Sequence, residues 1–99
     1  MYVRTLNFNL KPEAWEQAVA AIREQSIPLL EKQPGLHRMI VAGDRESGQG
    51  FVITFWETAA EAERYLESTQ VLHMMRLFLD MATAPPDIHG YPVVIDHDF

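Results

Sequence analysis

Residues 51–66 read FVITFWETAAEAERYL and change from a strand pattern to a helix start. The first six residues are apolar at every position except Thr54, a pattern typical of a strand that is covered on both faces. Thr58 and Glu61 then have the spacing of a capping box, in which the two side chains satisfy free amides at the beginning of a helix. The stretch therefore predicts a strand over residues 51–56 and a helix that begins near residue 59.

The sequence before this stretch predicts a strand, a long helix and a second strand. Residues 2–8 alternate in the manner of a strand. Apolar residues at i, i+3, i+4 and i+7 spacing predict an amphipathic helix from about residue 12 to residue 32. Pro28 should kink or split this helix near residues 25–27, because proline lacks the amide donor of its turn. Residues 36–44 fit a strand, and the polar segment with glycines that follows predicts a hairpin loop.

The sequence after this stretch predicts a broken helix and a last strand. The helix should break at Ser68-Thr69, before a second piece from about residue 70 to residue 82. That piece is apolar nearly all round and carries a single polar stripe, made of His73, Arg76 and Asp80. Residues 91–99 alternate again, which predicts a final strand.

The predicted order of elements is β-α-β-β-α-β within a single domain that spans residues 1–99. This is the ferredoxin-like α+β pattern, a four-stranded antiparallel sheet with both helices on one face. The other face of the sheet should then be polar in a monomer. Residues 51–56 instead offer apolar side chains to both faces, so we expect a second copy to cover the open face in a C2 homodimer.

Composition excludes several classes of function. The chain has 99 residues, 47% of them hydrophobic, and a net charge of −6 without any run of Lys or Arg. Nucleic acids and anionic membranes should repel such a domain. The absence of cysteine removes thiol chemistry and Cys-type metal sites, and no histidine spacing indicates a metal, so we expect none. No export signal is legible at the start of the sequence, which favours a cytoplasmic location.

Three segments together resemble a known family. They are Pro34-Gly35-Leu36, the strand FVITFWE over residues 51–57, and residues 61–66 followed by Ser68. This arrangement resembles the antibiotic biosynthesis monooxygenase family of the dimeric α+β barrel superfamily. The resemblance implies a homodimeric barrel in which each subunit has a pocket between its sheet and its helices. Members include oxygenases that form quinones without metal or flavin, haem-degrading monooxygenases and proteins of unknown activity.

The haem-degrading members use an Asn on the first strand, a Trp on the second helix and a His further along that helix. Asn7 matches the first of these positions, but Tyr65 stands in place of the Trp and Met75 in place of the axial His. His73 lies about 200° round the helix from that position and cannot replace it directly. The resemblance therefore implies chemistry without haem, and we expect no cofactor.

An oxygenase without a cofactor needs an apolar pocket for an easily oxidised ring, a base, and donors for the developing anion. Asn7, Tyr65 and His73 are the catalytic candidates. The candidates for substrate binding are Trp56, Arg76, His37 and Met75. For Asn7 the alternative is a locally satisfied side chain near a strand end, and for His73 and Arg76 it is a narrow solvated helix face.

We therefore expect a monooxygenase acting on a small aromatic or polycyclic phenol or hydroquinone. Two alternatives stay open, because a fold does not determine a reaction. One is a protein of the same fold that binds a small apolar ligand without catalysis. The other is an isomerase-type enzyme that uses His and Tyr side chains as acid and base.

Overall fold

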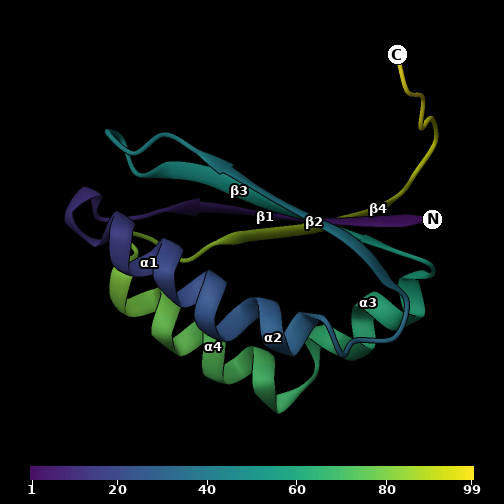
Figure 1. Cartoon of the computed structure of the whole chain (residues 1–99), viewed down its shortest axis with the longest axis horizontal. Helices are drawn as coiled ribbons and strands as arrows, with labels where there is room; N and C mark the ends of the chain where they lie inside the picture. The colour runs from purple at the N-terminus through teal and green to yellow at the C-terminus, as the bar shows by residue number, and fades with distance from the viewer.

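The computed structural model describes residues 1–99 and contains one four-stranded antiparallel sheet (Figure 1). The strands lie in the order β2-β3-β1-β4, as the ferredoxin-like pattern predicts. Both helical segments cover the same face of the sheet (Figure 1). The predicted fold is therefore confirmed. The strands are β1 (Tyr2–Asn9), β2 (Leu36–Gly43), β3 (Gln49–Trp56) and β4 (Asp87–Pro92).

The first helical segment contains an interruption. It consists of the 3₁₀ turn η1 (Pro12–Ala14), α1 (Trp15–Ala21), the π-helical turn η2 (Ile22–Ser26) and α2 (Ile27–Leu30). In η2 the Ile27 N–H donates to the Ile22 carbonyl, five residues back. Pro28, at the start of α2, has no N–H for the carbonyl four residues before it. The predicted break near residues 25–27 is confirmed, and it takes the form of a π turn.

The second helical segment consists of α3 (Ala59–Leu66) and α4 (Thr69–Met81). Thr58 caps α3 by accepting a hydrogen bond from the Glu61 amide, and its hydroxyl donates to the Glu61 carboxylate at 2.9 Å. Ser68 caps α4 in the same way by accepting from the amide three residues on. The predicted start near residue 59 and the predicted break are both confirmed.

Strand pairing determines which side chains face the helices. Leu6 pairs with Val52, and Arg4 pairs with Thr54, so the even-numbered residues of β1 and β3 share one face. The buried core lies between this face and the helices. The core cluster consists of Phe8, Leu10, Ala14, Ala18 and Met81.

No helix covers the opposite face of the sheet (Figure 1). Phe51, Ile53 and Phe55 of β3 lie on it, and Phe51 is 37% exposed. Val3 of β1 lies beside Phe55 in the register. The predicted apolar open face is therefore present.

The last strand differs from the prediction of a strand over residues 91–99. β4 ends at Pro92, which pairs with Tyr2 at the start of β1. Beyond it a single hydrogen bond, from the Val93 N–H to the Met1 carbonyl, continues the pairing. The prediction was wrong because β1 offers no further partner residues, so the alternating tail leaves the sheet (Figure 1). Val94 is 90% exposed as a result.

No helix of the chain combines the length and the apolar character that crossing a membrane requires.

Candidate functional site

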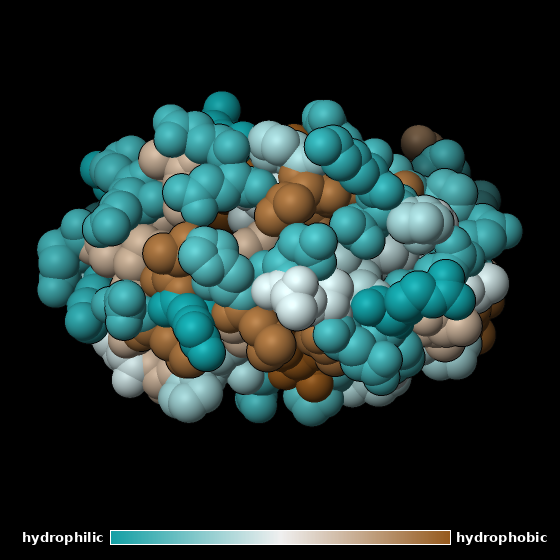
Figure 2. All heavy atoms as spheres, turned by 90° about the horizontal axis from the view of Figure 1, so that it is seen from below, coloured by the Kyte–Doolittle hydropathy of each residue, from teal (hydrophilic) through white to brown (hydrophobic).

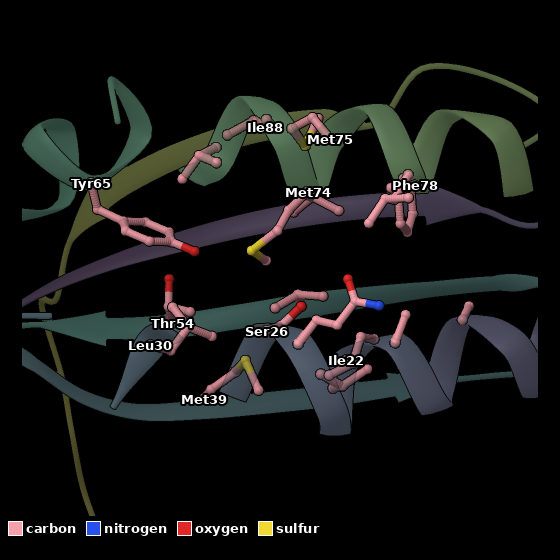
Figure 3. A pocket seen from close by; sticks show the side chains of 18 of the residues that line it. Ile22, Ser26, Leu30, Met39, Thr54, Tyr65, Met74, Met75, Phe78 and Ile88 are labelled. Atoms are coloured by element: carbon pink, nitrogen blue, oxygen red, sulfur yellow. The ribbon is translucent and has the colours of Figure 1, made fainter. Parts of the chain in front are cut away.

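A cavity of about 160 Å³ lies between the sheet and the helices (Figure 3). An engineered protein cavity of about 150 Å³ holds benzene, so the volume suits a single aromatic ring. Of the 21 lining residues, 17 are hydrophobic. They are Arg4, Leu6, Ala18, Ala21, Ile22, Gln25, Ser26, Leu30, Met39, Val41, Val52, Thr54, Tyr65, Leu66, Val71, Met74, Met75, Leu77, Phe78, Met81 and Ile88.

The cavity reaches solvent between the two helical segments. Gln25 of η2 and Leu77 of α4 both line it and are both exposed. Seen from the helix side, the surface is largely hydrophilic, with hydrophobic side chains gathered near its middle (Figure 2). A ligand can therefore enter from this side without displacing the sheet.

Tyr65 is the phenol that lines the cavity. Its ring packs on Trp56, with 5.5 Å between ring centroids, and its hydroxyl points into the cavity (Figure 3). Burial raises the pKa of Tyr65 above its ordinary value of 10.0. The hydroxyl therefore stays protonated at neutral pH and can donate a hydrogen bond to a ligand oxygen.

Trp56 is 1% exposed and supports the cavity wall from behind. Its indole N–H donates to Thr54 Oγ1 at 2.9 Å, so the only indole donor is used within the protein. Thr54 itself lines the cavity. Trp56 was predicted to bind substrate. The structure places it outside the lining, where it holds Tyr65 and Thr54 in position.

Met75 lines the cavity, as expected of a substrate-binding candidate. Met39, Met74 and Met81 line it as well. Methionine side chains are flexible and polarizable, so this wall can adjust to ligands of different outline.

His73 and Arg76 do not line the cavity. Both are exposed on α4, with Asp80 on the same face, so the alternative of a solvated helix face holds. Met74, Met75 and Phe78 of α4 line the cavity instead, whereas Leu72 and Leu79 remain exposed. The structure therefore does not support His73 as a base inside the cavity or Arg76 as a substrate ligand there.

His37 lies at the surface, where its Nε2 is 2.6 Å from a Glu57 carboxylate oxygen. It lines a second surface depression, which shares Leu30 and Met39 with the cavity but does not include Tyr65. This contact links His37, near the start of β2, to Glu57, the residue that follows β3. His37 therefore helps to hold the ends of these two neighbouring strands together.

Asn7 lies on the open face of the sheet, and the expectation that it points toward the helices was wrong. It is exposed, whereas Leu6 and Phe8, its neighbours on β1, face the cavity and the core. The alternation of strand side chains allows only one of the two parities to face the helices, and the larger apolar side chains occupy it.

The sequence prediction missed four polar side chains at the cavity, Arg4, Gln25, Ser26 and Thr54. Arg4 is one of the even-numbered residues of β1, which face the helices. Its charge among the apolar side chains of that face was the feature of the sequence that could have identified it. Gln25 and Ser26 belong to η2, and the π turn rotates them onto the cavity wall. Pro28 was the signal for that turn, which is a feature found frequently at functional sites.

The cavity lining includes no carboxylate and no imidazole. No group of three or more His, Asp or Glu side chains is arranged so that it could hold a metal ion. The chemistry available in the cavity is therefore hydrogen-bond donation from Tyr65, Ser26 and Gln25, together with the charge of Arg4.

Solved structures share this architecture. Rv0793 from Mycobacterium tuberculosis has a TM-score of 0.79 and 12% identity, with 98% of each chain covered. A crystal structure of an antibiotic biosynthesis monooxygenase has a TM-score of 0.79 and 16% identity, covering 96% of this chain and 100% of its own. NE2512, of unknown function, from Nitrosomonas europaea has a TM-score of 0.78 and 15% identity, with 97% and 91% covered. No curated protein matches the chain in sequence.

The chain is thus a ferredoxin-like α+β domain with a mainly apolar cavity between its sheet and its helices. The family model "Antibiotic biosynthesis monooxygenase" matches residues 1–77. The chain belongs to this family, and the resemblance of its sequence is thereby confirmed.

Proposed function

We propose that the protein is a cofactor-independent monooxygenase for a small phenol or hydroquinone. The observation that carries the proposal is the Tyr65 hydroxyl, which points into a mainly apolar, methionine-rich cavity. Apolar walls favour an uncharged ring, and a fixed donor favours a ring that carries oxygen. Membership of the family agrees with oxygenase chemistry.

The proposed reaction replaces the hydrogen on a ring carbon ortho or para to a hydroxyl by a carbonyl oxygen, at the ortho carbon when the substrate is a hydroquinone. The phenol first ionises, and its electron-rich anion reduces O₂. The resulting carbon-bound hydroperoxide then loses water to leave a quinone. One oxygen atom of O₂ enters the product, the other leaves as water, and the substrate supplies all the electrons. The Tyr65 hydroxyl stabilises the phenolate by donating to its oxygen.

The side chains of the cavity restrict the choice of substrate. His73 is exposed, and neither a carboxylate nor an imidazole lines the cavity, so no protein base stands beside the ring. The substrate must then ionise readily by releasing its proton to water. Hydroquinones and polyphenols with a stabilised anion meet this requirement better than simple phenols.

We also propose that the protein acts as a homodimer through the open face of its sheet. Phe51, Ile53 and Phe55 lie on that face, together with Val3. A contiguous apolar face of this kind is uncommon on a monomer, and a second copy related by a two-fold axis would cover it.

A ligand-binding protein without catalysis is the second candidate, and the lack of a base in the cavity favours it. An isomerase-type reaction has less support, because it needs an acid and a base in the same cavity. Oxygen uptake separates the candidates. The oxygenase consumes O₂ and forms, in equal amounts, a quinone that carries one oxygen atom more than the hydroquinone, whereas a binding protein saturates with the same compound and consumes none. Absence of uptake across a panel of bound hydroquinones would refute the oxygenase.

A further inference from the structure

We propose that Arg4 recognises a neutral oxygen of the ligand, a phenol hydroxyl or a ring carbonyl. The inference rests on the proposed binding of an aromatic compound in the cavity, but it does not require turnover. Arg4 lies on β1 among the residues that line the cavity, and its side chain is 12% exposed. It is the cationic residue of an otherwise nearly apolar lining.

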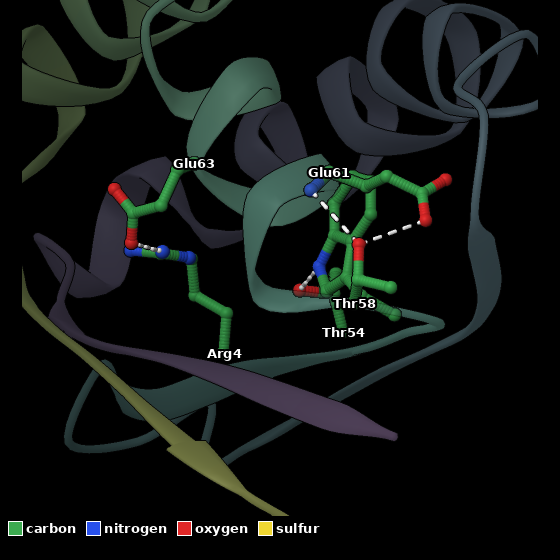
Figure 4. A network of polar contacts seen from close by, with 6 residues as sticks. Arg4, Thr54, Thr58, Glu61 and Glu63 are labelled. Atoms are coloured by element: carbon green, nitrogen blue, oxygen red, sulfur yellow. Dashed lines mark hydrogen bonds and ion pairs between the residues drawn. The ribbon is translucent and has the colours of Figure 1, made fainter.

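The guanidinium of Arg4 is only partly used within the protein. One terminal nitrogen contacts Glu63 Oε1 at 2.5 Å, on α3 (Figure 4). The Nε–H is buried and has no hydrogen-bond partner in the protein. A guanidinium has five N–H donors, and a buried donor without an acceptor is unfavourable. A ligand oxygen at this end of the cavity would supply the missing acceptor.

Glu63 determines the charge that this end of the cavity accepts. Its carboxylate already balances the positive charge of Arg4, and it is 53% exposed, so the ion pair extends from the cavity wall to solvent. A second carboxylate, from a ligand acid, would leave a net negative charge and would lose its hydration among apolar side chains. A hydroxyl or carbonyl oxygen accepts a hydrogen bond without that cost.

Arg4 and Tyr65 therefore make the cavity selective for oxygenated rings. An apolar cavity without a donor would prefer p-xylene to p-cresol, because p-xylene is the more hydrophobic compound. A donor that stays fixed in the cavity reverses this order, because burying the cresol oxygen then gains a hydrogen bond.

The test compares p-cresol, p-xylene and p-toluate as probes of the full chain. Binding is followed by nuclear magnetic resonance, using the methyl groups of Met39 and Met74 and the Arg4 Nε–H signal, which is assigned by its loss in Arg4→Lys. We expect p-cresol to shift the Arg4 Nε–H signal and p-toluate to bind more weakly than p-cresol. We also expect Arg4→Lys to reduce the preference for p-cresol over p-xylene by about tenfold.

Glu63→Gln is the matched control, because it removes the ion pair but keeps the guanidinium. The variant should retain the preference for p-cresol over p-xylene and should bind p-toluate more tightly than the wild type does. The proposal is overturned if the preference is the same in Arg4→Lys and wild type, if p-toluate binds the wild type best, or if no probe perturbs the methionine methyls. These outcomes are distinct from failure of the oxygenase, which would leave the selectivity intact and abolish only O₂ uptake.

Discussion

The ring centroid of Tyr65 lies 5.5 Å from that of Trp56, the last residue of β3. Trp56 in turn donates to Thr54 Oγ1 at 2.9 Å, which fixes the orientation of its indole. A phenol on a helix is thereby held at a defined place in the cavity by the most buried aromatic side chain of the molecule. Preorganisation of this kind is what lets a single donor contribute to binding.

Replacing Tyr65 by Phe should weaken binding of p-cresol by about fivefold, because it removes one hydrogen-bond donor and keeps the ring on Trp56. The melting temperature should change little. Titration followed by Trp fluorescence measures the first effect and calorimetry the second. His73→Ala is the control and should bind p-cresol as the wild type does. Equal affinities in all three proteins would remove Tyr65 from the site.

Tyr65 should also titrate above the ordinary pKa of tyrosine, because burial disfavours its anion. Its pKa is raised in the folded protein, so the folded state holds this proton more tightly than the unfolded state does. The contribution of Tyr65 to the free energy of unfolding is fully present below the unfolded-state pKa, near 10.0. It is lost as the pH rises from there toward the raised pKa of the folded state. Tyrosinate absorbance against pH should give one late transition, which Tyr65→Phe removes. Its persistence in that variant would assign the raised pKa to another tyrosine.

Replacing Trp56 by Phe should lower the free energy of unfolding by about 2 kcal/mol, because it leaves a cavity and deprives Thr54 of its donor. Trp15, which is only partly buried, offers a matched comparison. Trp15→Phe should cost less than about 1 kcal/mol. Urea unfolding curves give both values. A smaller loss for Trp56→Phe than for Trp15→Phe would contradict the role of Trp56 as the support of the cavity wall.

The proposed dimer predicts that light scattering at micromolar concentration gives twice the chain mass. Ile53→Lys places a charge in the centre of the open sheet face and should give a monomer. Leu72→Lys changes an exposed leucine on the helix side and should leave the mass unchanged. A monomeric wild type, or a dimer that Ile53→Lys does not affect, would contradict this use of the sheet face.

The order of elements and the turn at Pro28 followed from periodicity and from the missing amide of proline, and both could be predicted. The length of β4 could not, because alternation in residues 91–99 indicates strand character but not whether a partner strand extends far enough. β1 begins at Tyr2, and pairing ends there. The end of an edge strand therefore cannot be predicted from its own sequence without the register of its partner.

The candidate site was predictable in part. Tyr65 and Met75 line the cavity, as helical spacing allows. Asn7 was assigned to the wrong face of the sheet, because the odd-numbered and the even-numbered residues of β1 both include polar and apolar side chains. Only the packing of Leu6 and Phe8 shows which set faces the helices. Arg4 was overlooked, since its ion pair joins it to Glu63, which lies far away in sequence.

We propose that the cavity between the sheet and the helices is the site of oxygen chemistry. Ala21 lines it, whereas its neighbour Ala20 is exposed on the outer side of α1. Ala21→Phe should fill the cavity and Ala20→Phe should not. The decisive measurement is the rate of O₂ uptake with a hydroquinone that the wild type oxidises. Uptake abolished in folded Ala21→Phe and retained in Ala20→Phe is the predicted result, and uptake at the wild-type rate in Ala21→Phe would contradict the account.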